Sequence, residues 1–381
     1  MIFILFVFSM YPWFVWNSGL LSSTIILTGA IFSIFYWFFN RSIFCFNKKN
    51  IICSFILAIS LLFYSVAFNL FGIVQNLFVF IIILFLLNIN DHFKVKILDF
   101  ITKWFAIFLS ISLFYYILFL MGISLPFTYV DNSDLGYTGN NYYLFVVDHD
   151  IVFFPRFRSI FAEPGHLTMG IIPLLFANRF NLKNKFVVIL LLVEIFTFSL
   201  AGFALIFFSL FLLLFFVKNK IYIIILNMIL IISSITVYKS ANNDNIFYRI
   251  ILARLTYDDN KESIAGNNRT DSYVDSYFKN YIYSTDAIFG LGFEKSNQVT
   301  SAEGAGFKIF LLRFGIVTSI LTLFLYFSLA FNYLNKPTFG FLTILVLLLL
   351  QNAYPFMFCI IFIYILGIPK LYLKADVKIA G

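Results

Sequence analysis

The sequence has few charged residues and few cysteines, and each shortage excludes a class of protein. Only 12% of its 381 residues are charged, whereas a soluble domain carries about a quarter. Hydrophobic residues make up 62%, and Phe alone supplies 55. So much apolar surface cannot be buried in a soluble globular domain, and it equally excludes an intrinsically disordered chain. Three cysteines are too few for a secreted scaffold held by disulfides.

Long apolar runs are what the sequence does contain, and they predict an all-α polytopic integral membrane protein. Because spans of about 20 apolar residues recur, we expect about 12 transmembrane helices in a single transmembrane domain, 1–381. The first run has neither a basic start nor a small-residue cleavage site, so it is predicted to be a span and not a cleaved signal. The polar breaks place the spans near 2–16, 19–39, 50–68, 70–88, 97–121, 159–178, 186–200, 203–217, 220–238, 307–332, 338–352 and 355–371.

Basic residues alternate between the predicted connections. The short connections near 17–18, 69, 201–202 and 353–354 hold no Lys or Arg, whereas the intervening ones do. Cytoplasmic loops carry the excess of Lys and Arg, so both termini are predicted to be cytoplasmic. The net charge of +8 then partly reflects the membrane topology. The lipid bilayer is the expected partner, and no nucleic-acid partner is expected. The basic connections contain Arg41, Lys48, Lys49, Lys94, Lys96, Arg179, Lys183, Lys185, Lys218, Lys220, Lys336, Lys370, Lys374 and Lys378.

Two long loops fall on the outer side in this topology, 122–158 and 239–306. Polar residues gather in them, whereas transporters usually keep loops short and place polar groups at the membrane midplane. Regular segments are predicted near 244–256 and 270–283 of the larger loop. Tyr273, Tyr277 and Phe278 fall on one helical face of the second segment. Such a helix can lie on the bilayer or form one wall of a lipid-entry cavity.

The most informative motif lies where the first outer loop enters the sixth span. It begins with Arg156 and Arg158 and continues into a Glu163-Pro164-Gly165-His166 sequence. Glu163 and His166 are three residues apart and can share a helical face, and polar groups there should face protein or a water-filled cavity. One interpretation is a local Arg–Glu pair that closes the helix end. The other is an anion-binding pair of arginines beside an acid/base pair, because the planar Arg side chain binds phosphate with two hydrogen bonds.

Further polar residues stand in and after the larger loop. Arg269 is followed by the glycine-containing sequence 289–293, which by itself indicates only a turn. Glu303 precedes the tenth span and Arg313 lies within it, where we expect a carboxylate or phosphate partner. Glu194, in the seventh span, is expected to have a hydrogen-bonded structural role. The cysteines lack metal-ligand spacing, so neither a metal nor another cofactor is predicted.

The order of these motifs resembles the Wzy-type O-antigen and capsular polysaccharide polymerases, a family related to the O-antigen ligases. The matching stretches are 158–164 at the exit of the first loop, Arg269 in the larger loop, 289–293, and 307–315 leading into a late span. They cover a small part of the chain, but their order and placement extend over most of it. Ligases carry a His-Asn pair before the late span, where this chain reads Ser301-Ala302-Glu303-Gly304, which favours a polymerase.

This resemblance implies a metal-independent membrane glycosyltransferase of GT-C-like architecture in the bacterial inner membrane. Its substrates would be undecaprenyl-diphosphate-linked oligosaccharides, one as donor and one as acceptor, joined on the periplasmic side during lipopolysaccharide or capsule synthesis. A chain-length regulator protein is a further partner that the resemblance implies. Arg158 and Arg269 would hold the two diphosphates, and Arg156 and Arg313 are further candidates for binding diphosphate. Glu163 or Glu303 would be the base, with His166 as a third candidate.

Other classes of membrane protein share part of this pattern. An O-antigen ligase would use lipid A–core as acceptor, and the missing late His argues against it. A lipid-linked oligosaccharide flippase or another transporter would also have about twelve spans, but the long loop 239–306 is unusual for that class. A peptidoglycan polymerase of the shape-and-division class has a large outer loop as well, but its motifs are not seen here.

Overall fold

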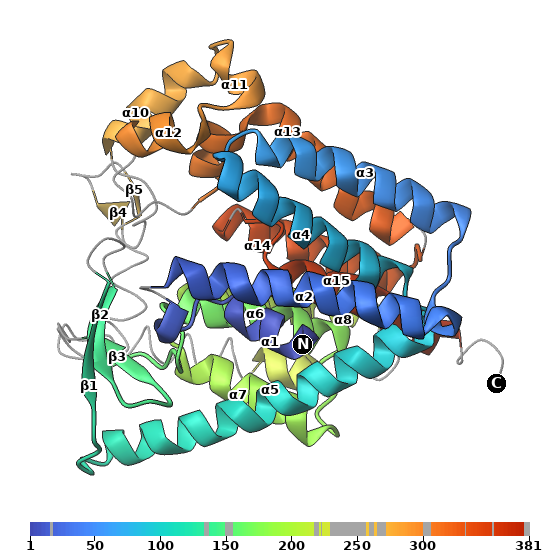
Figure 1. The fold of residues 1–381 in the computed structure, drawn as a ribbon. Coiled ribbons are helices and arrows are strands. Elements are labelled where there is room, and N and C mark those ends of the chain that lie inside the picture. Colours follow the sequence, from blue (N-terminus) through green and yellow to red (C-terminus); the bar gives the residue numbers. More distant parts are fainter. Residues whose placement is uncertain are drawn as a thin grey trace.

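A computed structural model of the chain shows a mostly helical protein (Figure 1). It describes residues 1–15, 18–132, 137–148, 155–216, 221, 223–228, 257–258, 263–264, 272–299, 306–331, 333–352 and 354–376. The predicted regular segment 244–256 lies outside these residues, as do Arg269 and Glu303.

Five of the described helices are long and apolar enough to cross a membrane. They are α2 (Gly19–Phe39), α3 (Lys48–Ser65), α4 (Leu70–Asn88), α5 (Asp91–Leu120) and α13 (Phe307–Phe331). Shorter apolar helices accompany them: α6 (Pro164–Ala177), α7 (Lys185–Phe196), α8 (Leu200–Leu214), α14 (Lys336–Gln351) and α15 (Phe358–Asp376). A helical membrane protein is therefore supported, while the count of twelve spans stays a prediction.

Asn and Ser residues at the polar breaks begin most of these helices. The side chain of Asn69 accepts a hydrogen bond from Gly72 N at 3.0 Å, and that of Asn90 accepts one from Phe93 N at 2.9 Å. Asn335 forms a capping box with Thr338. Such caps satisfy backbone N–H groups that have no partner within the helix. The breaks in hydropathy thus coincide with helix starts for a physical reason.

Several predicted spans differ in detail from the structure. The first contains only α1 (Ile2–Phe8), a helix of 7 residues, and a short 3-10 turn, η1 (Trp13–Val15). At about 1.5 Å per residue such a helix covers about 10 Å. The chain turns at Tyr11, whose φ is 60°, and then pairs with the segment before α6. The break predicted at 201–202 lies earlier, because Ser199 caps α8.

The third difference concerns α13, which was predicted as one continuous span. The helix is broken at Gly315, where φ is 75° and ψ is 176°. Only glycine adopts such a backbone conformation readily. The break separates a short segment that carries Arg313 from the longer helix that follows, Ile316–Phe331.

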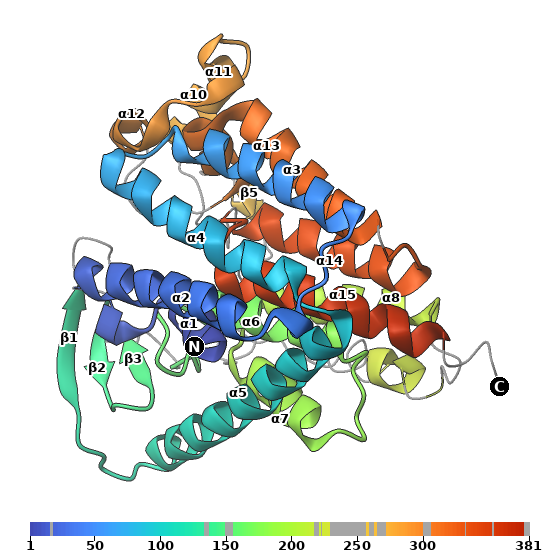
Figure 2. The ribbon, with the colours of Figure 1, turned by 45° about the vertical axis from the view of Figure 1, so that its right-hand side comes forward.

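The described helices pack in neighbouring pairs around α6 and α15. α2 lies against α4, α3 against α13, and α15 against both α5 and α6 (Figures 1 and 2). Every helical position of α6 except those of Gly165 and His166 is buried. These two helices are therefore the centre of the bundle, and the N-terminal turn of α6 is the place where its polar side chains meet the surface.

The two ends of the bundle have different structures. One end carries a three-stranded antiparallel sheet of β1 (Thr128–Asn132), β2 (Tyr137–Asn141) and β3 (Val146–Asp148), in which Val130 pairs with Gly139. It also carries α10 (Ser272–Tyr281), α11 (Asp286–Phe289), α12 (Gly292–Val299) and the pair β4 (Tyr257–Asp258) and β5 (Ser263–Ile264). We call this the loop end; it lies on the left in Figure 1. A sheet in the first outer loop was not predicted.

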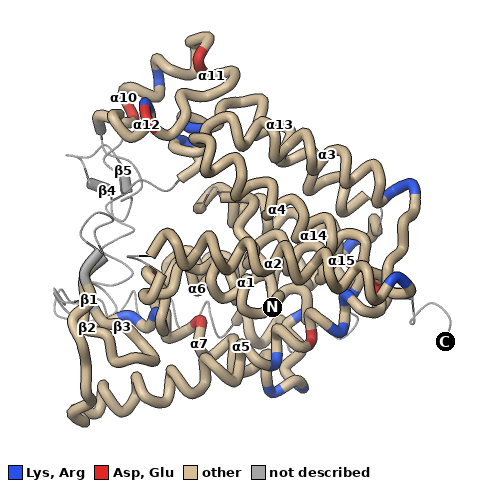
Figure 3. The backbone as a smooth tube through the Cα atoms, viewed as in Figure 1, with Lys and Arg blue, Asp and Glu red and all other residues tan. Residues whose placement is uncertain are grey.

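The opposite end is rich in Lys and Arg, as the blue segments on the right of Figure 3 show. We call it the basic end and define it by Arg41, Lys94, Arg179 and Lys370. The link between α2 and α3 pairs there with the link between α4 and α5, since Cys45 N donates to Asn88 O at 2.8 Å. All basic connections described thus gather on one side of the bundle. That arrangement agrees with the predicted alternation, while the cytoplasmic assignment stays a prediction.

Candidate functional site at the loop end

The segment 155–162, the first part of the predicted motif, is mostly buried and turns at Ser159, whose φ is 52°. It lies between the sheet and the link from α1 to α2. Val146 N donates to Ser159 O at 2.9 Å, Trp13 N donates to Ile160 O at 2.8 Å, and Ala162 N donates to Tyr11 O at 3.1 Å. On the other side, the hydroxyl of Tyr116 in α5 donates to Pro155 O. The backbone leading into α6 is therefore fixed by three other parts of the chain.

Arg158 connects this segment to the sheet. Its side chain is 3% exposed; Nε donates to Val146 O at 3.2 Å, and Nη1 donates to Ala162 O. Gly139 makes this approach possible, because a Cβ atom there would lie 3.1 Å from Nη2 of Arg158. The guanidinium thus holds β3 and the entrance of α6 together. Arg156 is half-buried.

Glu163 and His166 lie in the first turn of α6, with Pro164 at the first helical position as predicted. His166 N donates to Glu163 O at 3.1 Å, which places the two residues in one turn. The Glu163 side chain makes no capping hydrogen bond to the helix. Both side chains are half-buried. The two proposed acid/base groups therefore share the polar end of an otherwise buried helix.

Glu194 of α7 is buried next to this turn. It is 1% exposed, and Thr168 Oγ1 of α6 donates to its Oε1 at 2.6 Å. A side chain at Gly202, in the first turn of α8, would collide with the carboxyl group. Among the residues that the structure describes, the second oxygen of Glu194 has no hydrogen-bond partner. The expected hydrogen-bonded role is confirmed for one oxygen only.

A second polar cluster surrounds Arg313, which is 5% exposed. Its Nη1 donates to Tyr354 Oη at 2.6 Å, its Nη2 donates to Asn297 Oδ1 at 3.1 Å, and the guanidinium lies 4.8 Å from the centre of the Phe293 ring. Its Nε has no partner in the described part of the chain. A carboxylate or phosphate partner was expected here, and the partners among the described residues are neutral.

Two glycine-containing motifs hold Arg313 in place. Gly290 and Gly315, with φ of 85° and 75°, face each other so closely that a Cβ atom on Gly315 would lie 2.5 Å from Gly290 N. Leu291 N donates to Leu312 O at 2.7 Å, and Phe293 N donates to Ala67 O at 3.2 Å. The sequence 289–293, which alone indicated only a turn, is therefore the surface that α13 packs on at its break.

Helix α10 supports the same junction. The predicted helix at 270–283 is confirmed as Ser272–Tyr281. Its Val274 and Tyr281 are buried against Leu312, whereas Tyr273 is exposed. The Tyr281 hydroxyl donates to Leu311 O at 2.9 Å, and burial raises the pKa of this phenol to about 12, so that it stays a donor. The apolar face of α10 thus packs on the short segment that carries Arg313.

The predicted site residues fall into two groups in the described structure. Arg156, Arg158, Glu163 and His166 lie at the entrance of α6, whereas Arg313 lies at the break of α13, in contact with α12 and the α14–α15 link. Sequence reasoning missed Asn297 and Tyr354, because single neutral residues carry no signal without their three-dimensional neighbours. The predicted participation of Arg269 and Glu303 stays a prediction, since both lie outside the described residues.

Comparisons with protein-family models, with curated proteins and with solved structures find no match for this chain. The described residues contain no group of three or more His, Cys, Asp or Glu that could hold a metal ion.

Proposed function

We propose that the chain is a polysaccharide polymerase that transfers an undecaprenyl-diphosphate-linked glycan onto a lipid-linked repeat unit. One observation carries the proposal: within the described part of the chain, the buried guanidinium of Arg313 at the loop end has only neutral partners. A buried charge without a counter-charge is costly, so an anionic group of a substrate is a natural partner. The resemblance noted above supplies the chemical identity of that anion, a diphosphate.

The reaction needs a hydroxyl of the acceptor sugar to attack the anomeric carbon of the donor. The bond between that carbon and the diphosphate oxygen breaks, and the diphosphate lipid leaves with the bonding electron pair. A guanidinium stabilises the negative charge that develops on the leaving group. Among the described residues, the buried Nε of Arg313 has no partner, while its Nη2 donates to the exposed Asn297. A shift of α12 would let a phosphate replace Asn297 as the acceptor.

The proton of the attacking hydroxyl must go to a base. Glu163 is the first candidate, because its carboxyl group does not cap α6 and lies in the turn where the buried helix reaches the surface. Glu303 remains the second candidate from the sequence. His166 is proposed to orient the substrate and not to accept the proton. Arg158, Arg156 and Arg269 are proposed diphosphate contacts on the resemblance, and the hydrogen bonds of Arg158 to two carbonyls add a structural role.

A transporter, such as a flippase of lipid-linked oligosaccharides, is the second candidate function. The buried Glu194 favours it, because ionisable groups inside a helix bundle often belong to proton or ion pathways. A flippase moves its substrate without joining repeat units. The two functions therefore differ in whether a longer glycan is formed.

Purified protein, supplied with undecaprenyl-diphosphate-linked repeat units in lipid vesicles, should form a ladder of lipid-linked polymers without added metal. Arg313→Lys should slow formation of the ladder by about a hundredfold, whereas Lys183→Gln at the basic end should leave it unchanged. Movement of single repeats across the vesicle membrane with no ladder from the wild-type protein would favour the transporter.

Fusions of a topology reporter after Lys49, Asp134, Lys183 and Asn267 test on which side of the membrane these residues lie. A cytoplasmic position of Asn267 would contradict the mechanism.

A further inference from the structure

An apolar groove of about 340 Å³ lies between α1, α2, α4 and α5, and none of the candidate site residues described above lines it. Its residues come from α1, from the last turns of α2 and α4 and from the first turns of α5, and these turns of α2, α4 and α5 lie at the basic end (Figures 1 and 2). The volume is at the lower end of the range for ligand pockets, about 300 to 1,000 Å³. Its apolar lining includes Phe3, Phe32, Tyr36, Phe85, Ile97 and Phe100.

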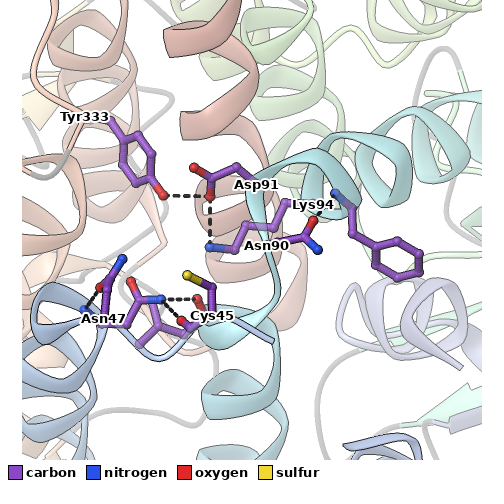
Figure 4. Close-up of polar contacts among 9 residues, drawn as sticks. Cys45, Asn47, Asn90, Asp91, Lys94 and Tyr333 are labelled. Atoms are coloured by element: carbon purple, nitrogen blue, oxygen red, sulfur yellow. Dashed lines mark hydrogen bonds and ion pairs between the residues drawn. The ribbon is translucent and has the colours of Figure 1, made fainter. Parts of the chain in front are cut away.

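Lys96 is the one charged side chain that lines this groove, and it is exposed. Two other lysines at the basic end, in contrast, form ion pairs with carboxylates of the protein. Lys94 lies 3.4 Å from Asp91, which also accepts a hydrogen bond from Tyr333 (Figure 4). Asp99, one turn further along α5, is the ion-pair partner of Lys370.

Within the described part of the chain, Lys96 itself has neither an ion-pair nor a hydrogen-bond partner. Its charge is therefore available to an anion from outside the protein.

We propose that this groove binds an acyl chain of an anionic phospholipid of the bilayer, with the ammonium group of Lys96 contacting the lipid phosphate. The aromatic and aliphatic lining suits a hydrocarbon chain. A lysine at the rim can place its apolar stem along the groove and its charge at the headgroup level. The Lys- and Arg-rich end of the bundle is where an attraction to anionic headgroups is strongest.

A second groove on the other side of α2 provides an internal comparison. It has about 330 Å³ and shares Phe85 with the first groove, and its lining includes Ile34, Trp37 and Phe44. Its lining contains Asn88 and Ser33 but no charged residue. The two grooves thus have similar volume and lining but differ in the cation. Only the groove with Lys96 should distinguish an anionic lipid from a zwitterionic one.

Native mass spectrometry of the full chain tests the preference. Phosphatidylglycerol and phosphatidylcholine with identical acyl chains are titrated onto the detergent-purified protein. The wild-type protein should bind phosphatidylglycerol about fivefold more tightly, the effect of one basic residue near an anionic lipid. Lys96→Gln should remove this preference. Lys103→Gln is the matched control, since Lys103 is exposed on the same helix and lines neither groove; it should behave as wild type.

A second measurement locates the lipid. Phe100→Trp places an indole in the groove at an exposed position. Brominated phosphatidylglycerol should quench this added fluorescence more than brominated phosphatidylcholine when Lys96 is present, and equally when it is Gln. Three results would each overturn the proposal. The first is a preference for phosphatidylglycerol that persists in Lys96→Gln, and the second is an equal loss of preference in Lys103→Gln. The third is equal quenching by the two lipids when Lys96 is present.

Discussion

The two ends of the bundle treat buried charge differently. At the basic end, Lys94 is paired with Asp91, and Lys370 is paired with Asp99 and also donates to Asn178 Oδ1 at 2.5 Å. At the loop end, Arg313 has a hydroxyl, an amide oxygen and an aromatic ring as partners, and Glu194 has one hydroxyl. Protein carboxylates thus balance the buried lysines, while Arg313 and Glu194 lack a partner of opposite sign among the residues that the structure describes.

This difference separates two uses of a charged residue. A lysine paired with a carboxylate joins helices, as Lys370 joins α15 to α5 and α6. A guanidinium with neutral partners keeps its charge for a group that comes from outside. On the proposed function, we therefore expect changes of the charged residues at the loop end to alter glycan transfer at constant protein abundance, and changes of those at the basic end to alter abundance at constant specific activity.

The largest effect is expected from Glu163→Gln, which removes the charge and nearly preserves the shape. If Glu163 accepts the proton, transfer should fall by about 100- to 10,000-fold, with single repeats accumulating on the lipid carrier. The measurement is the polymer ladder from equal amounts of membrane protein.

Glu303→Gln is the competing variant, and His166→Gln should have the smaller effect of a residue that orients the substrate. Full-length polymer from Glu163→Gln at normal abundance would assign the proton transfer to Glu303 or to the substrate itself.

Arg313→Lys should lower the transfer rate by about a hundredfold, because an ammonium group cannot donate two parallel hydrogen bonds to a phosphate. Abundance should stay close to normal, since the guanidinium balances no carboxylate among the described residues. Tyr354→Phe keeps the charge and removes one hydrogen bond, so its effect should be much smaller. If Arg313→Lys instead lowered abundance and left the rate per molecule unchanged, the contrast between the two ends would be wrong.

Gly290→Ala should misplace Arg313. A Cβ atom there would collide with the backbone of Arg313, and the positive φ adds strain of about 1–3 kcal/mol. We expect a loss of both abundance and activity, measured by thermal unfolding and by the ladder assay. Gly122→Ala is the control, because Gly122 also has a positive φ but no atom lies within 4 Å of its added Cβ. An equal loss in both variants would mean that strain alone matters.

Asp99→Asn tests the basic end. It leaves the buried Lys370 without its carboxylate, and we expect a loss of about 1–3 kcal/mol of stability, less than for a fully buried pair because the Asp99 side chain is 57% exposed. The melting temperature should fall while the rate per folded molecule is unchanged. A normal melting temperature with reduced transfer would contradict a purely structural role for this end.

The smallest effect is expected from Tyr281→Phe. This change removes the hydroxyl that donates to Leu311 O beside the break of α13, at a cost of about 1 kcal/mol. The melting temperature should fall by a few degrees. Tyr283→Phe, at a position that is 92% exposed, should change nothing measurable.

Much of the helical architecture could be predicted from the sequence, because lipid requires each span to satisfy its own backbone hydrogen bonds and so leaves a long apolar run. The starts of α4, α5 and α14 coincide with Asn caps for the same local reason. The sheet at 128–148 could not be predicted, since its short strands show no strong alternation of polar and apolar residues. The short α1 was also missed, because an apolar run does not reveal that the chain turns at Tyr11.

The sequence by itself determined that this is a helical membrane protein, that its basic residues lie on alternate connections, and that Arg158, Glu163, His166 and Arg313 deserve testing. The first two properties follow from composition and local periodicity, and the choice of residues follows from their motifs and from the resemblance to the polymerases. Only the tertiary structure decided what each charge contacts: two carbonyls for Arg158, and an amide, a phenol and a ring for Arg313. Such partners are brought together by packing between helices distant in sequence, as Gly290 meets Gly315. No local pattern encodes that proximity.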